Sequence, residues 1–354
     1  MTEGTSGGGA IYAGPVDSPK IVFILGSQRG GTTIFGRLLG EIEGFVFAGA
    51  VRRLWLTGPE RRCSCGEPNQ SCDLWSKVMT EALGDGITIA DVSQWQDRHL
   101  SNRHSWVGAV RMAVAARRGR GLEGDMAAYA GVAQRLYQEV ARQTGARVVV
   151  DTSKHPNDAM LLRQLPELSV FFVHIVRDPR GSAYSVQRRD VARRARRSSR
   201  VSTVTRALLP AWRAGHATLN WLTRHGASEA LRRMVPPDRS LLVRYEDLAE
   251  RPCEVLRQVA AFVGEAPGHF PDFSGDVVDL QVAHSPSCSK RLPAASVPFR
   301  LDERWITGLS SVEAVVTRAL AWPLMHRYGY GLRRPRRQSK HPGAPDRPSV
   351  PTAG

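Results

Sequence analysis

The chain has 354 residues, of which 42% are hydrophobic, so it can bury a sizeable core as one large domain or two modest ones. No apolar run approaches the ~20 residues that a membrane span needs, and the first residues lack a basic and apolar signal region, so we expect a cytoplasmic protein. The net charge of +16 would suit a nucleic acid, a membrane surface or an anionic small molecule, and charge alone does not decide among these.

The two ends differ in composition from the rest of the chain. Residues 1–18 are rich in glycine and serine, which is typical of a flexible tail. Residues 332–354 are rich in proline and arginine, which is typical of disorder. We therefore expect one folded domain over residues 19–331.

The first folded stretch reads KIVFILGSQRGGTT (20–33). Its apolar half predicts a strand buried on both faces, and the helix that follows is predicted to begin at Thr32. Between them, Gly26, Gly30 and Gly31 allow a tight turn that presents backbone N–H groups. A glycine-rich loop that leads into a helix N-terminus favours the binding of a phosphate over a plain turn.

This loop is similar to the ATP-binding pattern G-x-x-x-x-G-K-[ST], with one difference. Gly26 and Gly31 are correctly spaced, but Thr32 stands where the pattern has lysine, and the cation of the loop is Arg29. This exchange weakens a nucleoside triphosphatase interpretation. It suits a single phosphate and a group transferred from it.

Three cysteines lie in the next loop, at Cys63, Cys65 and Cys72. This spacing resembles part of a zinc site, which normally has four ligands. The nearest histidines along the chain, His99 and His104, are distant. We therefore favour a loop with reduced cysteines and no metal, and keep zinc as the alternative.

Strand and helix patterns alternate along the rest of the chain. We expect a short extended piece over 45–55, followed by helices over 74–143 with breaks at 84–86 and 117–124. After these helices we expect strands within 146–156, 169–179 and 238–248, and a helix over 252–263. This alternation predicts an α/β fold with a parallel sheet. The loops after the strands, including DTSK (151–154) and RDPRG (177–181), should meet at one edge of that sheet.

A second anion site is predicted after the strand within 169–179. Arg177 ends this strand, and Ser185 follows eight residues later, about two helical turns on. An arginine fork and a hydroxyl together suit a phosphate. With the first loop, they would hold a nucleotide that carries phosphates at its 5′ and 3′ ends.

At this point the sequence resembles the PAPS-dependent sulfotransferase family, in particular its bacterial members. The matching segments are SQRGGTT (27–33) and RDPRGSAYS (177–185), supported by VRYEDL (243–248) and LDERW (301–305). The CSCG loop and DTSK match as well. The resemblance covers roughly residues 20–330 and implies a P-loop-like three-layer fold with a central parallel sheet flanked by helices.

The resemblance also implies which residues hold the donor, PAPS. The 5′-phosphosulfate would be held by Ser27, Gln28, Arg29, Gly30, Gly31, Thr32 and Thr33. Arg29 would also stabilise charge on the leaving phosphate, and Arg177 and Ser185 would hold the 3′-phosphate. A late basic loop would close over the nucleotide, with Ser287, Lys290 and Arg291 as its candidate residues.

The implied reaction is in-line transfer of a sulfuryl group to a hydroxyl or amine, with no catalytic metal. We expect the acceptor to be a small molecule, glycan, lipid or secondary metabolite, bound under helices within 74–143 and 190–235. Nucleic acid is not an expected partner. The oligomeric state is left open by the sequence.

The general base is the part of the site that departs from the family pattern. Many bacterial relatives have Gly-Glu where this chain has Gly49 and Ala50, and alanine cannot accept a proton. Asp151 and His155 are candidate substitutes, and Lys154 would contact the sulfonate or the acceptor. A helix cap or a partner for Lys154 is an equally good interpretation of Asp151. An acceptor that is already nucleophilic, or a reduced activity, would also fit.

Three rival functions remain at this stage. A P-loop kinase is disfavoured by Thr32 and by the lack of a clear Mg²⁺ partner. A basic protein that binds polyanions without turnover would lose affinity steeply with salt. A family member that binds PAPS without transferring sulfate would be explained by Ala50.

Overall fold

The structure is a computed structural model that describes residues 18–56, 61–100, 105–194, 203–286 and 292–331. The tail predicted over 332–354 and nearly all of the one predicted over 1–18 lie outside these ranges. None of the described helices has both the length and the apolar composition that a membrane span requires.

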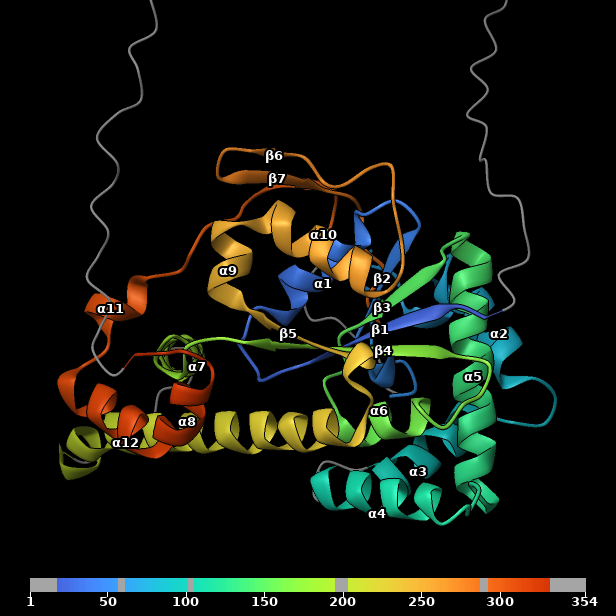
Figure 1. The fold of residues 1–354 in the computed structure, drawn as a ribbon, viewed down its shortest axis with the longest axis horizontal. Helices are drawn as coiled ribbons and strands as arrows, with labels where there is room; N and C mark the ends of the chain where they lie inside the picture. Colours follow the sequence, from blue (N-terminus) through green and yellow to red (C-terminus); the bar gives the residue numbers. More distant parts are fainter. Residues whose placement is uncertain (1–17, 57–60, 101–104, 195–202, 287–291, 332–354) are drawn as a thin grey trace, which may run out of the picture.

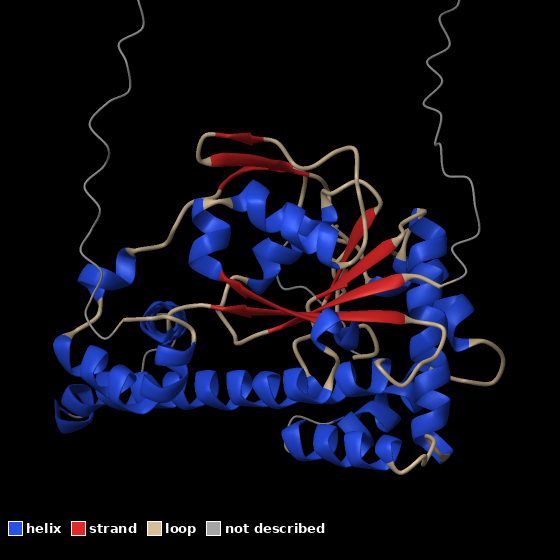
Figure 2. Ribbon diagram, viewed as in Figure 1, coloured by secondary structure: helices blue, strands red, loops and turns tan. Residues whose placement is uncertain are grey.

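Five parallel strands form the central sheet (Figures 1 and 2). In chain order they are β1 (Lys20–Leu25), β2 (Phe45–Gly49), β3 (Val148–Asp151), β4 (Ser169–Val176) and β5 (Ser240–Arg244). Their spatial order is β2-β3-β1-β4-β5. The four predicted strands are confirmed, and the extended piece predicted over 45–55 becomes the strand at one edge.

Alternation along β1 explains why this strand lies at the centre. Ile21, Phe23 and Leu25 point into a core on one face of the sheet, and Val22 and Ile24 point into a core on the other. All five side chains are fully buried. A strand buried on both faces has no polar positions, which is why its sequence reads as a continuous apolar run.

Helices cover both faces of the sheet, which makes three layers (Figures 1 and 2). One layer contains α1 (Thr32–Gly40), α9 (Tyr245–Glu250) and α10 (Pro252–Phe262). The other contains α2 (Trp75–Leu83), α3 (Ile89–Leu100), α4 (Ser105–Arg117), α5 (Gly124–Thr144), α6 (Pro156–Leu162) and the long α8 (Thr203–Met234). The predicted α/β class and the helix breaks within 74–143 are confirmed.

The remaining elements lie beside this three-layer core. They are α7 (Pro179–Arg194), α11 (Arg304–Gly308), α12 (Ser311–Arg327) and the 3₁₀ turns η1 (Val51–Arg53), η2 (Asn69–Ser71) and η4 (Pro237–Arg239). A small antiparallel sheet consists of β6 (Phe273–Ser274), β7 (Val277–Leu280) and β8 (Ala295–Pro298). The sequence did not predict this sheet, because its strands have two to four residues and carry little periodicity.

The strand order fixes where the functional loops meet. β1 pairs with β3 on one side and with β4 on the other, both in parallel. The loops that leave their carboxyl ends therefore lie side by side, as predicted. These loops carry SQRGGTT, DTSK and RDPRG.

Candidate functional site: a nucleotide-sized cleft and an adjoining pocket

A cleft of about 730 Å³ opens at the carboxyl edge of the sheet. Five of the segments singled out in the sequence contribute to it, together with η1. Its lining includes Gln28, Arg29, Gly31, Thr32, Thr33, Arg53, Lys154, Arg177, Ser185, Tyr245 and Asp302. The first loop and the Arg177–Ser185 pair thus share one cavity.

The glycine loop leaves the beginning of α1 open to a ligand. Gly31 is the N-cap of this helix, and as a glycine it has no side chain to cap the free amides of the first turn. The first turn also has no acidic residue. Free N–H groups and the positive end of the helix dipole attract an anion.

Glycine is required at position 31 for two separate reasons. Its φ of 87° is left-handed, which disfavours a residue with a side chain. A Cβ at this position would also lie 2.4 Å from Cδ2 of Tyr245. The loop therefore packs against the start of α9, and this contact sets the shape of the cleft.

Arg29 joins the two predicted anion sites. Its Nε donates a hydrogen bond to Ser185 Oγ at 2.8 Å, and its carbonyl oxygen accepts one from Arg177 Nη1 at 3.2 Å. Arg29 also has a positive φ of 64°, which is uncommon for a residue other than glycine. Such strained conformations concentrate at functional sites, where the surrounding structure holds them.

Arg177 is buried and held from several sides. Its guanidinium lies 4.5 Å from the ring centre of Tyr245, and its Nη2 donates to Asp302 Oδ2 at 3.2 Å. Arg304 and then Arg177 hold the pKa of Asp302 below its usual range. Tyr245 and Asp302 come from VRYEDL and LDERW, so these two segments position the arginine.

Ser27 lies at the base of the loop and is only 3% exposed. Its Oγ has no hydrogen-bond partner among the described residues. A buried hydroxyl without a partner is unusual in a folded protein. A ligand oxygen in the loop would supply the missing partner.

A second pocket of about 320 Å³ adjoins the cleft. The two cavities share Gln28, Arg53 and Lys154. The second pocket is further lined by Ala50, Arg52, Gln96, Asp97, Ser153, His155 and Arg224, among others. Ala50, the position at which the resemblance implies a missing glutamate, lines this pocket.

Lys154 lies where the two cavities meet. Burial, followed by the nearby charges of Arg224 and Arg53, lowers the pKa of Lys154 to about 8. Its φ is 66°, the second positive value at a non-glycine residue in the described chain. At neutral pH this side chain is a cation that loses its proton more easily than an ordinary lysine. It lies between the larger cleft and the smaller pocket.

His155 is poorly suited to act as a base. Burial, together with the charges of Arg52 and Arg224, lowers the pKa of His155 to about 2. Its Nε2 lies 3.4 Å from Arg224 Nη1. A histidine with so low a pKa is uncharged at neutral pH, and its unprotonated ring nitrogen accepts a proton weakly.

Asp151 does not line the cleft or the adjoining pocket. It is 1% exposed and accepts hydrogen bonds from Tyr137 Oη at 2.5 Å and from the Ser153 amide at 2.6 Å. Burial raises the pKa of Asp151 to about 6. The structure thus places this carboxylate beneath the loop, where it holds the loop backbone.

Sequence reasoning missed several residues of the second pocket: Arg52, Gln96, Asp97 and Arg224. They lie on η1, α3 and α8, where polar residues are common and these four belong to no recognisable motif. The helical segments 74–143 and 190–235 contribute residues to this pocket, and their role in binding the acceptor stays a prediction. Ser287, Lys290 and Arg291, the candidates of the late basic loop, lie outside the described residues.

Comparison with known proteins identifies the family. The family model described as "Sulfotransferase family" matches residues 19–267, which is more than half of the chain. The chain belongs to the sulfotransferase family. A search of curated proteins gave no match.

Solved structures similar to this sulfotransferase include bacterial proteins. A sulfotransferase domain from the curacin biosynthetic pathway is 17% identical, with a TM-score of 0.44, over 89% of this chain and 99% of that one. A sulfotransferase from Alicyclobacillus acidocaldarius is 13% identical, with a TM-score of 0.43, over 88% and 96%. The sulfotransferase domain of an olefin synthase from Synechococcus PCC 7002 is 22% identical, with a TM-score of 0.37, over 70% and 74%.

Proposed function

We propose that this sulfotransferase uses PAPS as its donor. The observation that carries the proposal is the contact between the two anion sites, in which Arg29 Nε lies 2.8 Å from Ser185 Oγ. One nucleotide that bears phosphate groups at both ends could span this cleft. ATP has no 3′-phosphate for Arg177 and Ser185 to bind.

The residues of the cleft fit the two ends of such a donor. The amides at the start of α1, the hydroxyl of Ser27 and the side chain of Arg29 would hold the 5′-phosphosulfate. Arg177 and Ser185 would hold the 3′-phosphate. When bound, PAPS supplies a sulfuryl group that passes to the acceptor oxygen or nitrogen, which loses a proton, and PAP is left.

The adjoining pocket would hold the acceptor. Arg52, Arg53, Lys154 and Arg224 line it, and Asp97 is the carboxylate among its described lining residues. Such a positive pocket favours an acceptor that carries an anionic group beside its hydroxyl or amine. A small molecule, glycan or lipid with this chemistry would fit, and a cytoplasmic location remains our prediction.

Binding of PAP, AMP and ATP to the full chain tests the donor. We expect PAP to bind more tightly than AMP, because only PAP has the 3′-phosphate, and to need no Mg²⁺. Isothermal titration calorimetry measures all three affinities, and labelled PAPS tests for transfer to acceptors. Tight Mg²⁺-ATP binding with indifference to PAP would point to a kinase. If other polyanions bind as tightly as PAP, with an affinity that falls steeply as the salt concentration rises, the protein binds polyanions without turnover.

The pH dependence of transfer should report on Lys154. We propose that its cation stabilises the transferred group, so the rate falls as the pH rises through about 8, where Lys154 loses its proton. The variant Lys154→Arg should move this fall to higher pH, because arginine stays protonated. Initial rates from pH 6 to 10 measure both. A rate that instead rises through about 8 in the wild type, and not in the variant, would make Lys154 the base.

Ala50 gives a prediction for the acceptor side. With a hydroxyl acceptor, Ala50→Glu should raise the transfer rate about 10²-fold, because a positioned base contributes about 10²–10⁴-fold. PAP affinity should not change, since Ala50 lines only the adjoining pocket. Ala50→Gln, which has the same size but no base, is the matched control. Equal rates for the two variants would show that no base is missing at this position.

A further inference from the structure

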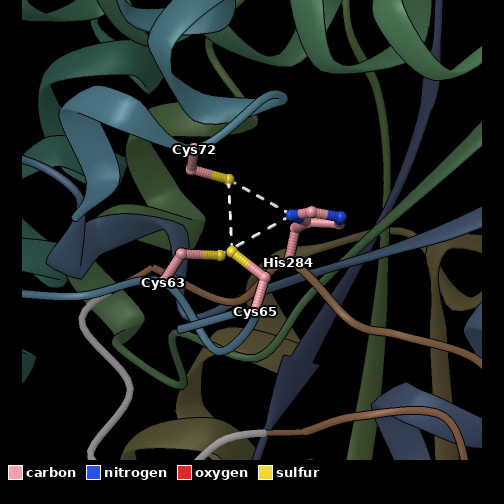
Figure 3. Close-up of side chains that lie close together, drawn as sticks. All are labelled: Cys63, Cys65, Cys72 and His284. Atoms are coloured by element: carbon pink, nitrogen blue, oxygen red, sulfur yellow. Dashed lines mark hydrogen bonds between the residues drawn. The ribbon is translucent and has the colours of Figure 1, made fainter. Parts of the chain in front are cut away.

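Three cysteines and one histidine converge on a single point outside the two cavities (Figure 3). Cys63, Cys65 and Cys72 come from the loop between η1 and α2, and His284 comes from the segment after β7. Cys63 and Cys72 are buried, and the other two are half-buried. Sequence reasoning found no fourth ligand because 212 residues separate Cys72 from His284.

Three of the six distances among the four ligand atoms lie within about 0.4 Å of those around a tetrahedral zinc ion. A zinc ion about 2.3 Å from each sulfur and about 2.0–2.1 Å from a nitrogen places two sulfurs about 3.8 Å apart, and a sulfur and a nitrogen about 3.6 Å apart. Cys65 Sγ lies 3.8 Å from Cys72 Sγ. His284 Nδ1 lies 3.2 Å from Cys72 Sγ and 3.7 Å from Cys63 Sγ. All four ligand atoms lie within 4.8 Å of one another.

The surrounding groups orient these ligands as they do in metal sites. The loop turns back after Cys63, whose carbonyl accepts from the Gly66 amide at 3.0 Å. Trp75 Nε1 donates to the His284 carbonyl at 3.0 Å and so fixes the histidine backbone.

We propose that Cys63, Cys65, Cys72 and His284 form a structural zinc site. Four protein ligands close the coordination shell, which is the pattern of structural rather than catalytic zinc. Three thiolates and one imidazole also suit zinc better than a hard cation such as Mg²⁺ or Ca²⁺. The site is separate from the donor cleft, and this inference does not depend on the nature of the donor.

The zinc would join two parts of the fold that are distant in sequence. Ser64 already links them, since its amide donates to the Ser285 carbonyl at 3.0 Å and its Oγ accepts from the Ser285 amide at 2.8 Å. Ser285 in turn packs on Gly49, where an added Cβ would lie 2.0 Å from Ser285 Oγ. Gly49 precedes Ala50 of the adjoining pocket. The metal would therefore brace the end of β2 beside that pocket.

Metal analysis of the full-length wild type, purified without chelators, tests the proposal directly. We expect one zinc ion per chain by mass spectrometry of the metal content, and a lower unfolding temperature after zinc is removed by a strong chelator. Replacement of zinc by Co²⁺ should give the thiolate-to-metal charge-transfer bands of a tetrahedral site. Wild type that holds no zinc and takes up none on incubation would overturn the proposal, as would a bound iron centre.

Three variants separate a metal site from a cysteine-rich core. Cys65→Ser should lose most of the zinc, whereas Cys253→Ser, which changes a half-buried cysteine on α10, should keep it. His284→Cys should also keep it, because four thiolates bind zinc as well. Thiol titration of the unfolded wild type should find all five cysteines reduced. A disulfide among the three loop cysteines, or zinc retained by Cys65→Ser, would refute the assignment.

Discussion

Replacement of Arg29 by alanine should lower the turnover number for sulfuryl transfer about 10²–10³-fold, the effect of removing one preorganised charge donor from a transition state. Arg29 is the cation within the phosphate loop, and its side chain reaches from this loop to Ser185. Charge builds up on the leaving phosphate during transfer, so the arginine contributes more to the transition state than to the bound donor. Steady-state kinetics with labelled PAPS measures the loss.

Two further variants make the Arg29 result specific. Arg142→Ala removes an exposed arginine on α5 that pairs only with nearby Glu139 in the described structure, and it should leave the rate unchanged. Arg29→Lys keeps the charge but loses the Nε contact with Ser185, so it should recover part of the rate. If Arg29→Ala turns over within a few-fold of the wild type, Arg29 does not stabilise the leaving phosphate.

Replacement of Arg177 by methionine should weaken PAP binding about 10–100-fold. Hydrogen bonds to charged groups contribute about 1.5–3 kcal/mol, and each 1.4 kcal/mol corresponds to about tenfold in affinity. AMP, which has no 3′-phosphate, should lose much less affinity. The dissociation constant of AMP divided by that of PAP, both measured by calorimetry, should therefore fall towards one in the variant.

Arg177 also contacts Asp302 and Tyr245, so a change in folding must be separated from a change in binding. The unfolding temperature of Arg177→Met without nucleotide provides this check. Ser185→Ala, which removes one neutral hydroxyl, should reduce the preference for PAP by a smaller factor. Equal losses of PAP and AMP affinity in a folded Arg177→Met variant would place the 3′-phosphate elsewhere.

Local sequence patterns determined the centre of the fold and the loops that line the cleft of about 730 Å³. The apolar run at 21–25 required a strand buried on both faces, and the glycines after it required a tight turn before a helix. Arg177 and Ser185 lie in one strand–helix unit, so their spacing could be read directly. Each of these features depends on residues within about ten positions of one another, where chain geometry leaves few alternatives.

Only the tertiary structure decided which distant residues complete these sites. The place of Asp151 at the end of β3 makes it a candidate base, but its side chain turns inward to Tyr137, a contact that no local pattern encodes. The adjoining pocket takes Gln96 and Arg224 from two separate helices. His284 reaches the cysteine cluster across 212 residues. Such pairings follow from how whole elements pack, and packing is set by the complete core rather than by any single segment.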